Sequence, residues 1–201
     1  MSNKKTEIKQ GLLVVLSAPS GCGKTSIVER LLKRQKDWTR SISATTRPPR
    51  IGEKNGEDYF FLSREEFEKK ITDGQILEHA EIYGQLYGTP KDFVAQQIAQ
   101  GKVVILTIDV QGTQQVMKFW GKQNPLLSIF ILPPSIKALR ERLTGRNTDT
   151  PEEIEKRIGI AQEEIKAATL YDHTVINQSL DQAVLDVETI ILNITKQRRT
   201  Q

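Results

Sequence analysis

The sequence predicts an α/β fold in which a parallel β-sheet carries helices on both faces. Continuous apolar runs at 12–16, 103–108 and 126–132 have the length and composition of strands that are buried on both faces. Helical spacing of apolar residues follows each run, and strands that alternate with helices form parallel sheets. The chain has 201 residues, which is enough for one such domain with small insertions.

The first apolar run leads into a glycine-containing loop, made of Ala18, Pro19, Ser20, Gly21, Cys22, Gly23, Lys24 and Thr25. Gly21 and Gly23 allow backbone conformations in which successive N–H groups turn toward one anion, and the helix start adds unpaired N–H groups. Lys24 supplies a cation for the terminal phosphates, and the Thr25 hydroxyl can hold Mg²⁺. Strand, loop and helix together predict a P-loop NTPase-type site for a nucleoside triphosphate.

One residue of the loop departs from the usual pattern G-x-x-x-x-G-K-[ST]. Ala18 stands where the first glycine belongs. Alanine fits there only if its φ is negative and its Cβ points away from the phosphates. The alternative interpretation of the whole stretch is an ordinary strand, turn and helix with a surface lysine.

Composition limits the remaining possibilities. The net charge of +4 and the pI of about 9.1 fit arginines clustered around a nucleotide, and we expect no nucleic-acid partner. A single cysteine, Cys22, excludes an internal disulfide and favours a reducing compartment. It acts either as a small filler or as a thiol whose oxidation blocks the loop. No apolar stretch suits a signal peptide or a membrane span, so we expect a cytoplasmic protein.

The segment 39–97 interrupts the alternation of strands and helices and is predicted to be a mostly β insertion that holds a second substrate. Arg47 and Arg50 flank two prolines that stiffen the chain, and rigidly spaced guanidinium groups suit a phosphate dianion. A solvated basic loop is the alternative. Strands are expected at 58–62 and 76–83, a helix with a capping box at 63–73, a turn at 84–89 and a helix at 90–99.

The second half of the chain completes the core. Asp109 follows the run 103–108, where it either orients Mg²⁺ or its waters, or caps the helix expected at 112–120. A strand at 173–176 ends at Asn177, and a helix follows over 179–195. We therefore assign 11–38, 98–134 and 170–196 to the core nucleotide-binding domain, 1–10 to a disordered lead and 197–201 to a solvated basic tail.

Two charged helices, expected at 135–144 and 150–168, form a predicted lid over 135–169. They are rich in Arg, Lys and Glu and poor in large apolar residues, so we expect them to be loosely held and to move. Arg142, Arg146 and Arg157 are the residues that a closing lid would bring onto the transferring phosphate. Each alone is also compatible with an ordinary surface arginine.

Eight motifs, in one order along the chain, resemble those of guanylate kinases. They are SAPSGCGKT at 17–25, SATTRPPRIGE at 43–53, GEDY at 56–59, LEHA at 77–80, YGT at 87–89, IDVQG at 108–112, RLTGR at 142–146 and VIN at 175–177. The resemblance implies transfer of the γ-phosphoryl group from ATP to GMP, and also to dGMP, with Mg²⁺, in purine nucleotide metabolism. It implies that the partners are these small molecules, and we expect a monomer or a homodimer.

The same resemblance assigns roles to individual residues. Those that match the GMP site are Ser43, Arg47, Arg50, Tyr59 and Tyr87 for the phosphate, Glu78 and Thr89 for guanine, and Glu53 and Asp109 in the same region. Those that match catalytic groups are Lys24, Arg47, Arg142, Arg146 and Arg157, and Asn177 matches a residue near adenine. A carboxylate suits guanine because it accepts from the N1–H and the 2-amino group, which adenine does not offer.

Three positions depart from the family pattern. Thr107 stands where many members have an acid, Asn147 replaces a glycine, and Gln178 follows Asn177 where Asn or Asp is usual. Two other functions are possible alternatives, a kinase for a sugar phosphate and a catalytically inactive guanylate-kinase-like module that binds phosphorylated protein. The Glu78–Thr89 pair argues against the first, and the intact loop and arginines argue against the second. A GTPase is disfavoured because no N-K-x-D motif is visible.

Overall fold

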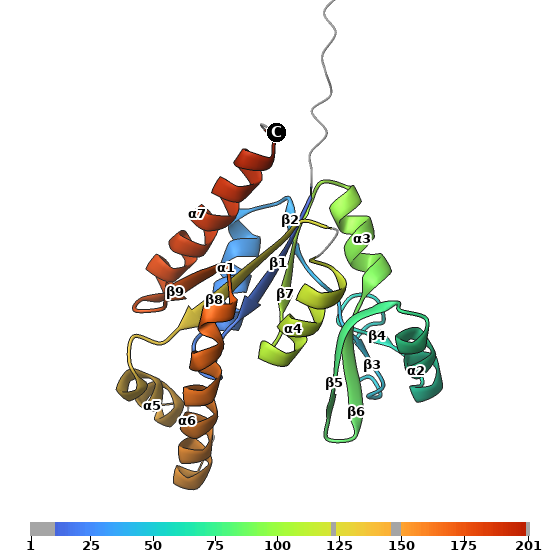
Figure 1. Ribbon diagram of the computed structural model, residues 1–201. Coiled ribbons are helices and arrows are strands. Elements are labelled where there is room, and N and C mark those ends of the chain that lie inside the picture. Colours follow the sequence, from blue (N-terminus) through green and yellow to red (C-terminus); the bar gives the residue numbers. More distant parts are fainter. Residues whose placement is uncertain (1–10, 122–123, 146–149, 200–201) are drawn as a thin grey trace, which may run out of the picture.

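The structure is a computed structural model that describes residues 11–121, 124–145 and 150–199. A five-stranded parallel sheet in the order β2-β7-β1-β8-β9 forms its centre. Its strands are β1 (Leu12–Ser17), β2 (Trp38–Arg40), β7 (Val103–Thr107), β8 (Leu126–Leu132) and β9 (His173–Ile176). Helices cover both faces of this sheet (Figure 1), which confirms the predicted fold class.

The helices are α1 (Lys24–Arg34), α2 (Arg64–Thr72), α3 (Lys91–Ala99), α4 (Val110–Phe119), α5 (Ile136–Thr144), α6 (Pro151–Lys166) and α7 (Leu180–Arg199), with a 3₁₀ turn, η1 (Ala167–Leu170). Side chains of β1 alternate between the two helical layers. Leu12, Val14 and Leu16 pack in a cluster with residues of α1, α5, α6 and α7, whereas Leu13 and Val15 pack with residues of α3 and α4. This burial on both faces explains why the strand is a continuous apolar run.

A second, four-stranded sheet lies beside the first and has the order β4-β3-β6-β5. Its strands are β3 (Ala44–Thr45), β4 (Phe60–Phe61), β5 (Ile76–Ile82) and β6 (Gln85–Pro90). Helix α2 covers it with the buried Phe67, and the expected capping box forms between Ser63 and Glu66. Leu77 of β5 joins the apolar cluster of α3 and α4, so the small sheet is anchored to the core.

The predicted turn at 84–89 was wrong. Residues 85–90 form strand β6, which pairs antiparallel with both β5 and β3. The tight turn consists of Tyr83 and Gly84 alone, and both have positive φ, 51° and 76°. Gly88 has a different role, because a Cβ there would lie 2.6 Å from the carbonyl oxygen of Glu78. A glycine is therefore needed at position 88 because two strands pack closely there. A sequence pattern does not distinguish such a glycine from one in a turn.

Other element positions also differ from the sequence prediction. Strand β2 pairs with β7, so residues 39–40 belong to the main sheet, and β3 was not expected. Pro90 is the N-cap of α3 and lies just before the first helical position. Helix α7 continues through Arg199, so residues 197–199 of the predicted tail are helical. The predicted lead, 1–10, and the end of the tail, 200–201, lie outside the described residues.

The two helices of the predicted lid contribute more to the core than expected. Leu139 and Leu143 of α5 and Ile154 and Ile158 of α6 are buried in the main apolar cluster. The prediction that this segment has little to bury was therefore wrong. The helical period spreads these apolar residues among charged ones, which hides the buried face in a linear reading.

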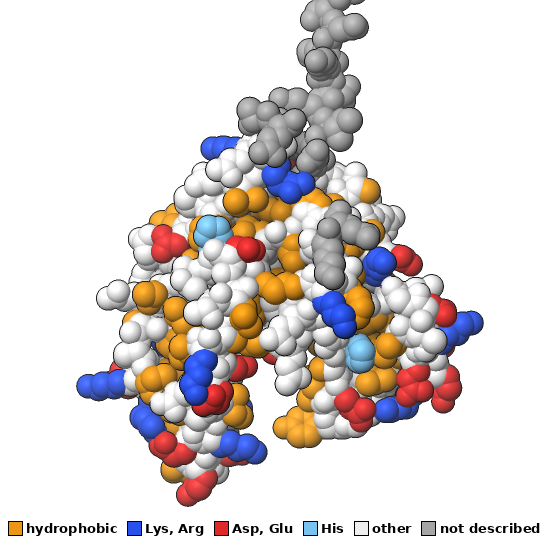
Figure 2. Space-filling model, in the orientation of Figure 1, with side chains coloured by type: hydrophobic (Ala, Val, Ile, Leu, Met, Phe, Trp, Pro, Cys, Tyr) orange, Lys and Arg blue, Asp and Glu red, His pale blue; other side chains and the backbone are white. Residues whose placement is uncertain are grey.

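The arrangement leaves two lobes at one end of the main sheet. Helices α5 and α6 form one lobe, and the small sheet with α2 forms the other (Figure 1). Figure 2 shows that the surface is hollowed between them. In the part of the chain that the structure describes, no helix combines the length and apolar character needed to cross a membrane.

The β5–β6 turn yields a stability prediction. Tyr83 is fully exposed (101%) with a left-handed backbone, which a Cβ-bearing residue adopts at a cost. Asn tolerates this conformation, and Asn-Gly is the preferred pair for such turns. We expect Tyr83→Asn to raise the free energy of unfolding by about 1 kcal/mol, seen by urea denaturation. Tyr83→Ala is the control, since alanine keeps the penalty, and an equal gain in both variants would contradict this explanation.

Candidate active site

The loop between β1 and α1 lies at the carboxyl end of β1, beside the hollow. Gly21 and Gly23 have φ of 90° and 83°, the left-handed region that glycine favours. A Cβ on Gly21 would meet Leu143 at 2.9 Å, and one on Gly23 would meet the Asn177 amide nitrogen at 2.7 Å. Ala18 has no positive φ and is buried in the main apolar cluster, so it meets the backbone condition for replacing glycine.

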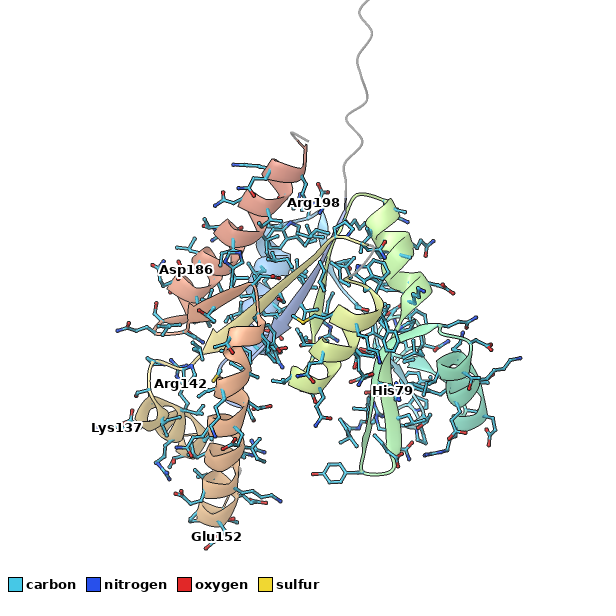
Figure 3. The ribbon with its side chains drawn as sticks, viewed as in Figure 1. His79, Lys137, Arg142, Glu152, Asp186 and Arg198 are labelled. Carbon is cyan, nitrogen blue, oxygen red and sulfur yellow. The ribbon has the colours of Figure 1, made fainter. Side chains whose placement is uncertain are left out.

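Asn177 and Arg142 connect the loop to the lobe of α5 and α6. The Asn177 side-chain amide donates to the carbonyl oxygen of Cys22 at 2.8 Å, and Arg142 donates to the Asn177 carbonyl oxygen at 2.7 Å. Figure 3 shows Arg142 where α5 meets the main sheet. Among the described residues, the buried Oδ1 of Asn177 has no hydrogen-bond partner. A buried acceptor of this kind calls for an explanation, such as a ligand or an ordered water that completes its hydrogen bonding.

Cys22 is fully buried within the loop. Burial raises the pKa of its thiol to about 11, so the thiol stays protonated near neutral pH. Because the thiolate is the form that reacts, this geometry favours the filler role over the oxidation-sensitive one.

The loop lines a cavity of about 380 Å³ that also contains Asp109 and Glu164. The Lys24 ammonium donates to the carbonyl oxygen of Ile108 at 3.2 Å. Burial lowers the pKa of Lys24, and the charges of Asp109 and Glu164 oppose this effect. Burial raises the pKa of Glu164, which comes from α6 and was not among the predicted site residues. No local motif marks Glu164, because only the packing of α6 brings it to the loop.

Asp109 is the N-cap of α4, and its carboxylate accepts from the Gly112 N–H at 2.8 Å. A cluster of hydroxyl groups holds the backbone at Asp109 in place. Thr113 donates to the Asp109 carbonyl oxygen at 2.7 Å, lies 2.8 Å from the Ser17 hydroxyl and accepts from Tyr171 at 3.0 Å. The capping alternative is therefore correct, and it leaves Asp109 lining the loop cavity as well.

The Glu78–Thr89 pair forms a buried polar contact on the small sheet. Thr89 donates its hydroxyl proton to Glu78 Oε1 at 2.6 Å, and Glu78 is only 7% exposed. Burial raises the pKa of the Glu78 carboxyl, and the charge of Asp109 raises it further. Glu78 Oε2 lies 3.0 Å from the place that a Cβ on Gly112 would occupy. Glycine at 112 therefore gives the carboxylate room beside α4.

The local backbone directs Glu78. His79 pairs with Gly88 but Ile76 pairs with Pro90, so the two residues between them on β5 face a single residue of β6, Thr89. This is a β-bulge, and bulges re-aim side chains. The sequence offers no signal for it.

Arg47 belongs to a second cluster, on the turn that follows β3. It donates twice to Glu53, at 2.9 and 3.0 Å, and Glu53 also accepts from the Arg50 N–H at 2.7 Å. The Arg47 guanidinium lies 5.4 Å from the ring centre of Tyr59, which packs edge-on against Tyr87 at 6.1 Å. The ion pair raises the pKa of Arg47 and lowers that of Glu53. The side chains of four predicted GMP-site residues thus lie together, and the ion pair with Glu53 holds Arg47 in position. The four are Arg47, Glu53, Tyr59 and Tyr87.

The remaining predicted residues that the structure describes lie on several separate elements. Ser43 precedes β3, its carbonyl oxygen accepts from Phe60, and the Arg50 side chain is exposed. Arg157 lies half-buried on α6, and Thr107 ends β7 beside Thr25 in a smaller cavity of about 160 Å³. Arg146 and Asn147 lie outside the described residues.

Comparison with known proteins gives a consistent result. The guanylate kinase family model matches residues 10–194. The chain is similar to a guanylate kinase of Synechocystis (48% identity, 92% of this chain and 94% of that one) and to one of Thiobacillus denitrificans (44% identity, 95% and 90%). A guanylate kinase structure from Anaplasma phagocytophilum superimposes with a TM-score of 0.69 at 32% identity, over 94% of this chain and 89% of that one. A gluconokinase structure from Sinorhizobium meliloti (15% identity, TM-score 0.50, 96% and 98%) shares the fold alone.

The raised pKa of Glu78 predicts that its carboxyl lowers the free energy of unfolding of the ligand-free protein. Above about pH 4.5, the ordinary pKa, burial makes ionisation of this carboxyl less favourable in the folded chain than in the unfolded chain. Below that pH the group is protonated in both, and the cost vanishes. We expect Glu78→Gln to increase the free energy of unfolding of the ligand-free protein at pH 7, with the gain growing as pH rises from 4.5 and absent below it.

Urea denaturation across pH 4 to 8 measures this difference. Glu57→Gln is the matched control, because the Glu57 side chain is 67% exposed, and its effect should stay within about 0.5 kcal/mol at every pH. A gain in Glu78→Gln that does not vary with pH would show that burial of charge is not its cause.

Proposed function

The chain belongs to the guanylate kinase family of nucleoside monophosphate kinases, and on that premise we propose that it transfers the γ-phosphoryl group of ATP to GMP and dGMP, with Mg²⁺, in purine nucleotide metabolism. One observation carries the proposal. Asp109 lines the phosphate-loop cavity, and its Oδ1 and the Glu78 Oε2 lie 3.4 and 3.0 Å from one point, the place that a Cβ on Gly112 would occupy. A triphosphate site and a base-reading carboxylate are therefore neighbours, as transfer between two nucleotides requires.

The acceptor half rests on two clusters. In the first, Glu78 would accept from the guanine N1–H and 2-amino group while Thr89 occupies its Oε1. A buried carboxylate that loses these partners is costly, so a base that lacks them is rejected. In the second, Arg47, Tyr59 and Tyr87 would hold the GMP phosphate. A phosphate dianion suits a guanidinium flanked by phenolic hydroxyls.

The donor half rests on the loop. Its left-handed glycines turn N–H groups toward a single anion, and Lys24 would move from the Ile108 carbonyl to the β- and γ-phosphates. The free acceptor of Asn177 suits the exocyclic amino group of adenine. Arg142, Arg146 and Arg157 are proposed to reach the transferring phosphoryl group.

The residues around the loop also fit Mg²⁺. The cavity lining includes the Thr25 hydroxyl and the carboxylates of Asp109 and Glu164, and this is the all-oxygen donor set that Mg²⁺ prefers. Thr25 would hold the ion directly, and Asp109 would hold it through water. When bound, Mg²⁺ would neutralise part of the phosphate charge.

We propose direct in-line transfer. Phosphoryl transfer requires positioning and charge stabilisation and no covalent nucleophile on the protein. The GMP phosphate oxygen attacks, while Lys24, the loop N–H groups and the lid arginines stabilise charge on the moving group. Approach of the two lobes would exclude water, which would otherwise hydrolyse ATP. A cytoplasmic location suits a chain whose one cysteine is a buried thiol, and the assembly is proposed to be a monomer or homodimer.

Substrate choice provides the direct test. We expect ADP formation from ATP and Mg²⁺ with GMP and dGMP, and background rates with AMP, UMP, ribose 5-phosphate or no acceptor. Glu78→Gln should lower kcat/KM for GMP roughly 10- to 100-fold, because a charged hydrogen-bond acceptor is lost. A coupled ADP-release assay measures both results. Turnover with ribose 5-phosphate would favour the sugar-phosphate rival, and GMP binding without turnover would favour the inactive module.

Arg47 gives a second functional prediction. Arg47→Lys keeps the charge but loses the paired N–H groups, so kcat/KM for GMP should fall roughly 10- to 100-fold while KM for ATP is unchanged. Steady-state kinetics with each substrate varied in turn separates the two effects. Arg30→Lys on α1, in an exposed pair with Asp181, is the control and should behave as wild type. An equal loss toward both substrates would remove Arg47 from the GMP site.

A further inference from the structure

Gln115 on α4 makes an unusual contact with the backbone of strand β5. Its side-chain carbonyl accepts from the His79 N–H at 3.1 Å, and its side-chain NH₂ donates to the His79 carbonyl oxygen at 3.1 Å. Strand β5 is an outer strand of the small sheet, so among the described residues no strand pairs with one of its edges. The Gln115 carboxamide takes the place of a partner strand for one residue. His79, labelled in Figure 3, is the middle residue of β5.

The contact falls immediately beside Glu78. The β-bulge interrupts the regular ladder between Ile76 and His79, so pairing with β6 constrains Glu78 less than a regular strand would. The backbone of the next residue, His79, is instead fixed from the opposite side by Gln115. The position of the Glu78 Cα therefore depends on the contact with α4.

Helix α4 presents two residues to β5 from one face. Gly112 and Gln115 are three positions apart and so are neighbours on the helix surface. Gly112 gives the Glu78 carboxylate room, and Gln115 holds the backbone that bears it. Asp109 caps the same helix. Helix α4, which Asp109 caps beside the phosphate-loop cavity, thus also determines the position of the Glu78 carboxylate.

Apolar packing at this junction is incomplete. A cavity of about 270 Å³ lies between β5 and α4, with Leu77, His79, Gln115 and Phe119 among its lining residues. Close-packed side chains would hold the strand without a polar contact. Because a cavity adjoins the strand here, the two hydrogen bonds to the Gln115 carboxamide determine where β5 lies against α4.

We propose that Gln115 is a positioning residue for guanine recognition, which sets the place of the Glu78 carboxylate by holding the His79 backbone. This inference rests on the proposed function, since it concerns the group assigned to read guanine. Gln115 does not touch the substrate in this role. It acts through β5.

Gln115→Met removes both hydrogen bonds at similar side-chain length, and Gln114→Met on the exposed adjacent position is the matched control. The readout is the ratio of kcat/KM for GMP to that for inosine monophosphate, the analogue without the 2-amino group. We expect Gln115→Met to raise KM for GMP and to reduce the ratio roughly tenfold or more, as an ångström-scale displacement does. KM for ATP and the values for Gln114→Met should stay at wild-type level.

Two further measurements separate positioning from general stability. With Glu78→Gln already present, Gln115→Met should change the ratio less than about twofold, because the two residues act as one unit. The His79 amide should exchange with solvent at least tenfold faster in Gln115→Met, measured by NMR. If Gln115→Met fails to fold, Gln115→Glu keeps the acceptor for the His79 N–H and loses the donor, and its GMP-to-inosine-monophosphate ratio should also fall.

The outcomes distinguish the inference from the proposed function. Wild-type protein that does not phosphorylate GMP overturns both. Wild-type activity together with an unchanged ratio in Gln115→Met or, if that variant does not fold, in Gln115→Glu overturns the inference alone. A lower melting temperature with an unchanged ratio assigns Gln115 a purely structural role and also overturns it.

Discussion

Burial of β1 between two helical layers is the constraint on which the rest of the molecule depends. Every residue of this strand is buried, and its side chains alternate between two apolar clusters. The strand is packed on both faces and paired with β7 and β8 on both edges, so packing and hydrogen bonds restrain its carboxyl end. The phosphate loop begins at that end, so its backbone N–H groups are presented from a rigid base, as electrostatic stabilisation of a phosphoryl group requires. Packing of the apolar core thus determines the position of the phosphate loop.

The buried polar groups extend this rigidity toward the second site. Ser17, Thr113 and Tyr171 place their hydroxyls beneath the loop and hold the backbone at Asp109. Asp109 caps α4, and α4 carries Gly112 and Gln115 to β5. A polar group that is buried without a partner is costly, so each such contact specifies one arrangement. A connected path of hydrogen bonds and packed helix therefore runs from the phosphate loop to the carboxylate of Glu78.

Glu78 itself illustrates the cost of such a site. Its charge is unfavourable in the ligand-free protein, where burial and Asp109 raise the pKa of its carboxyl. Thr89 satisfies one oxygen and leaves capacity for a ligand. Under the proposed function, Glu78 is a binding group that destabilises the protein until its ligand is bound, and such groups are common at functional sites. Cys22 differs, since burial raises the pKa of its thiol and so disfavours the reactive thiolate.

Local sequence signals were sufficient to predict the parallel core, the phosphate loop and the family to which the chain belongs. Continuous apolar runs, paired glycines and capping residues are local signals, and each depends on neighbours within a few positions. Tertiary structure alone decided that 85–90 is a strand, that α5 and α6 share the main core, and that Glu164 and Gln115 reach sites formed by distant segments. These features depend on contacts between residues far apart in the chain. The free energy of such contacts comes from close packing and from hydrogen bonds between buried polar groups. Local patterns of residues along the sequence do not indicate either of these.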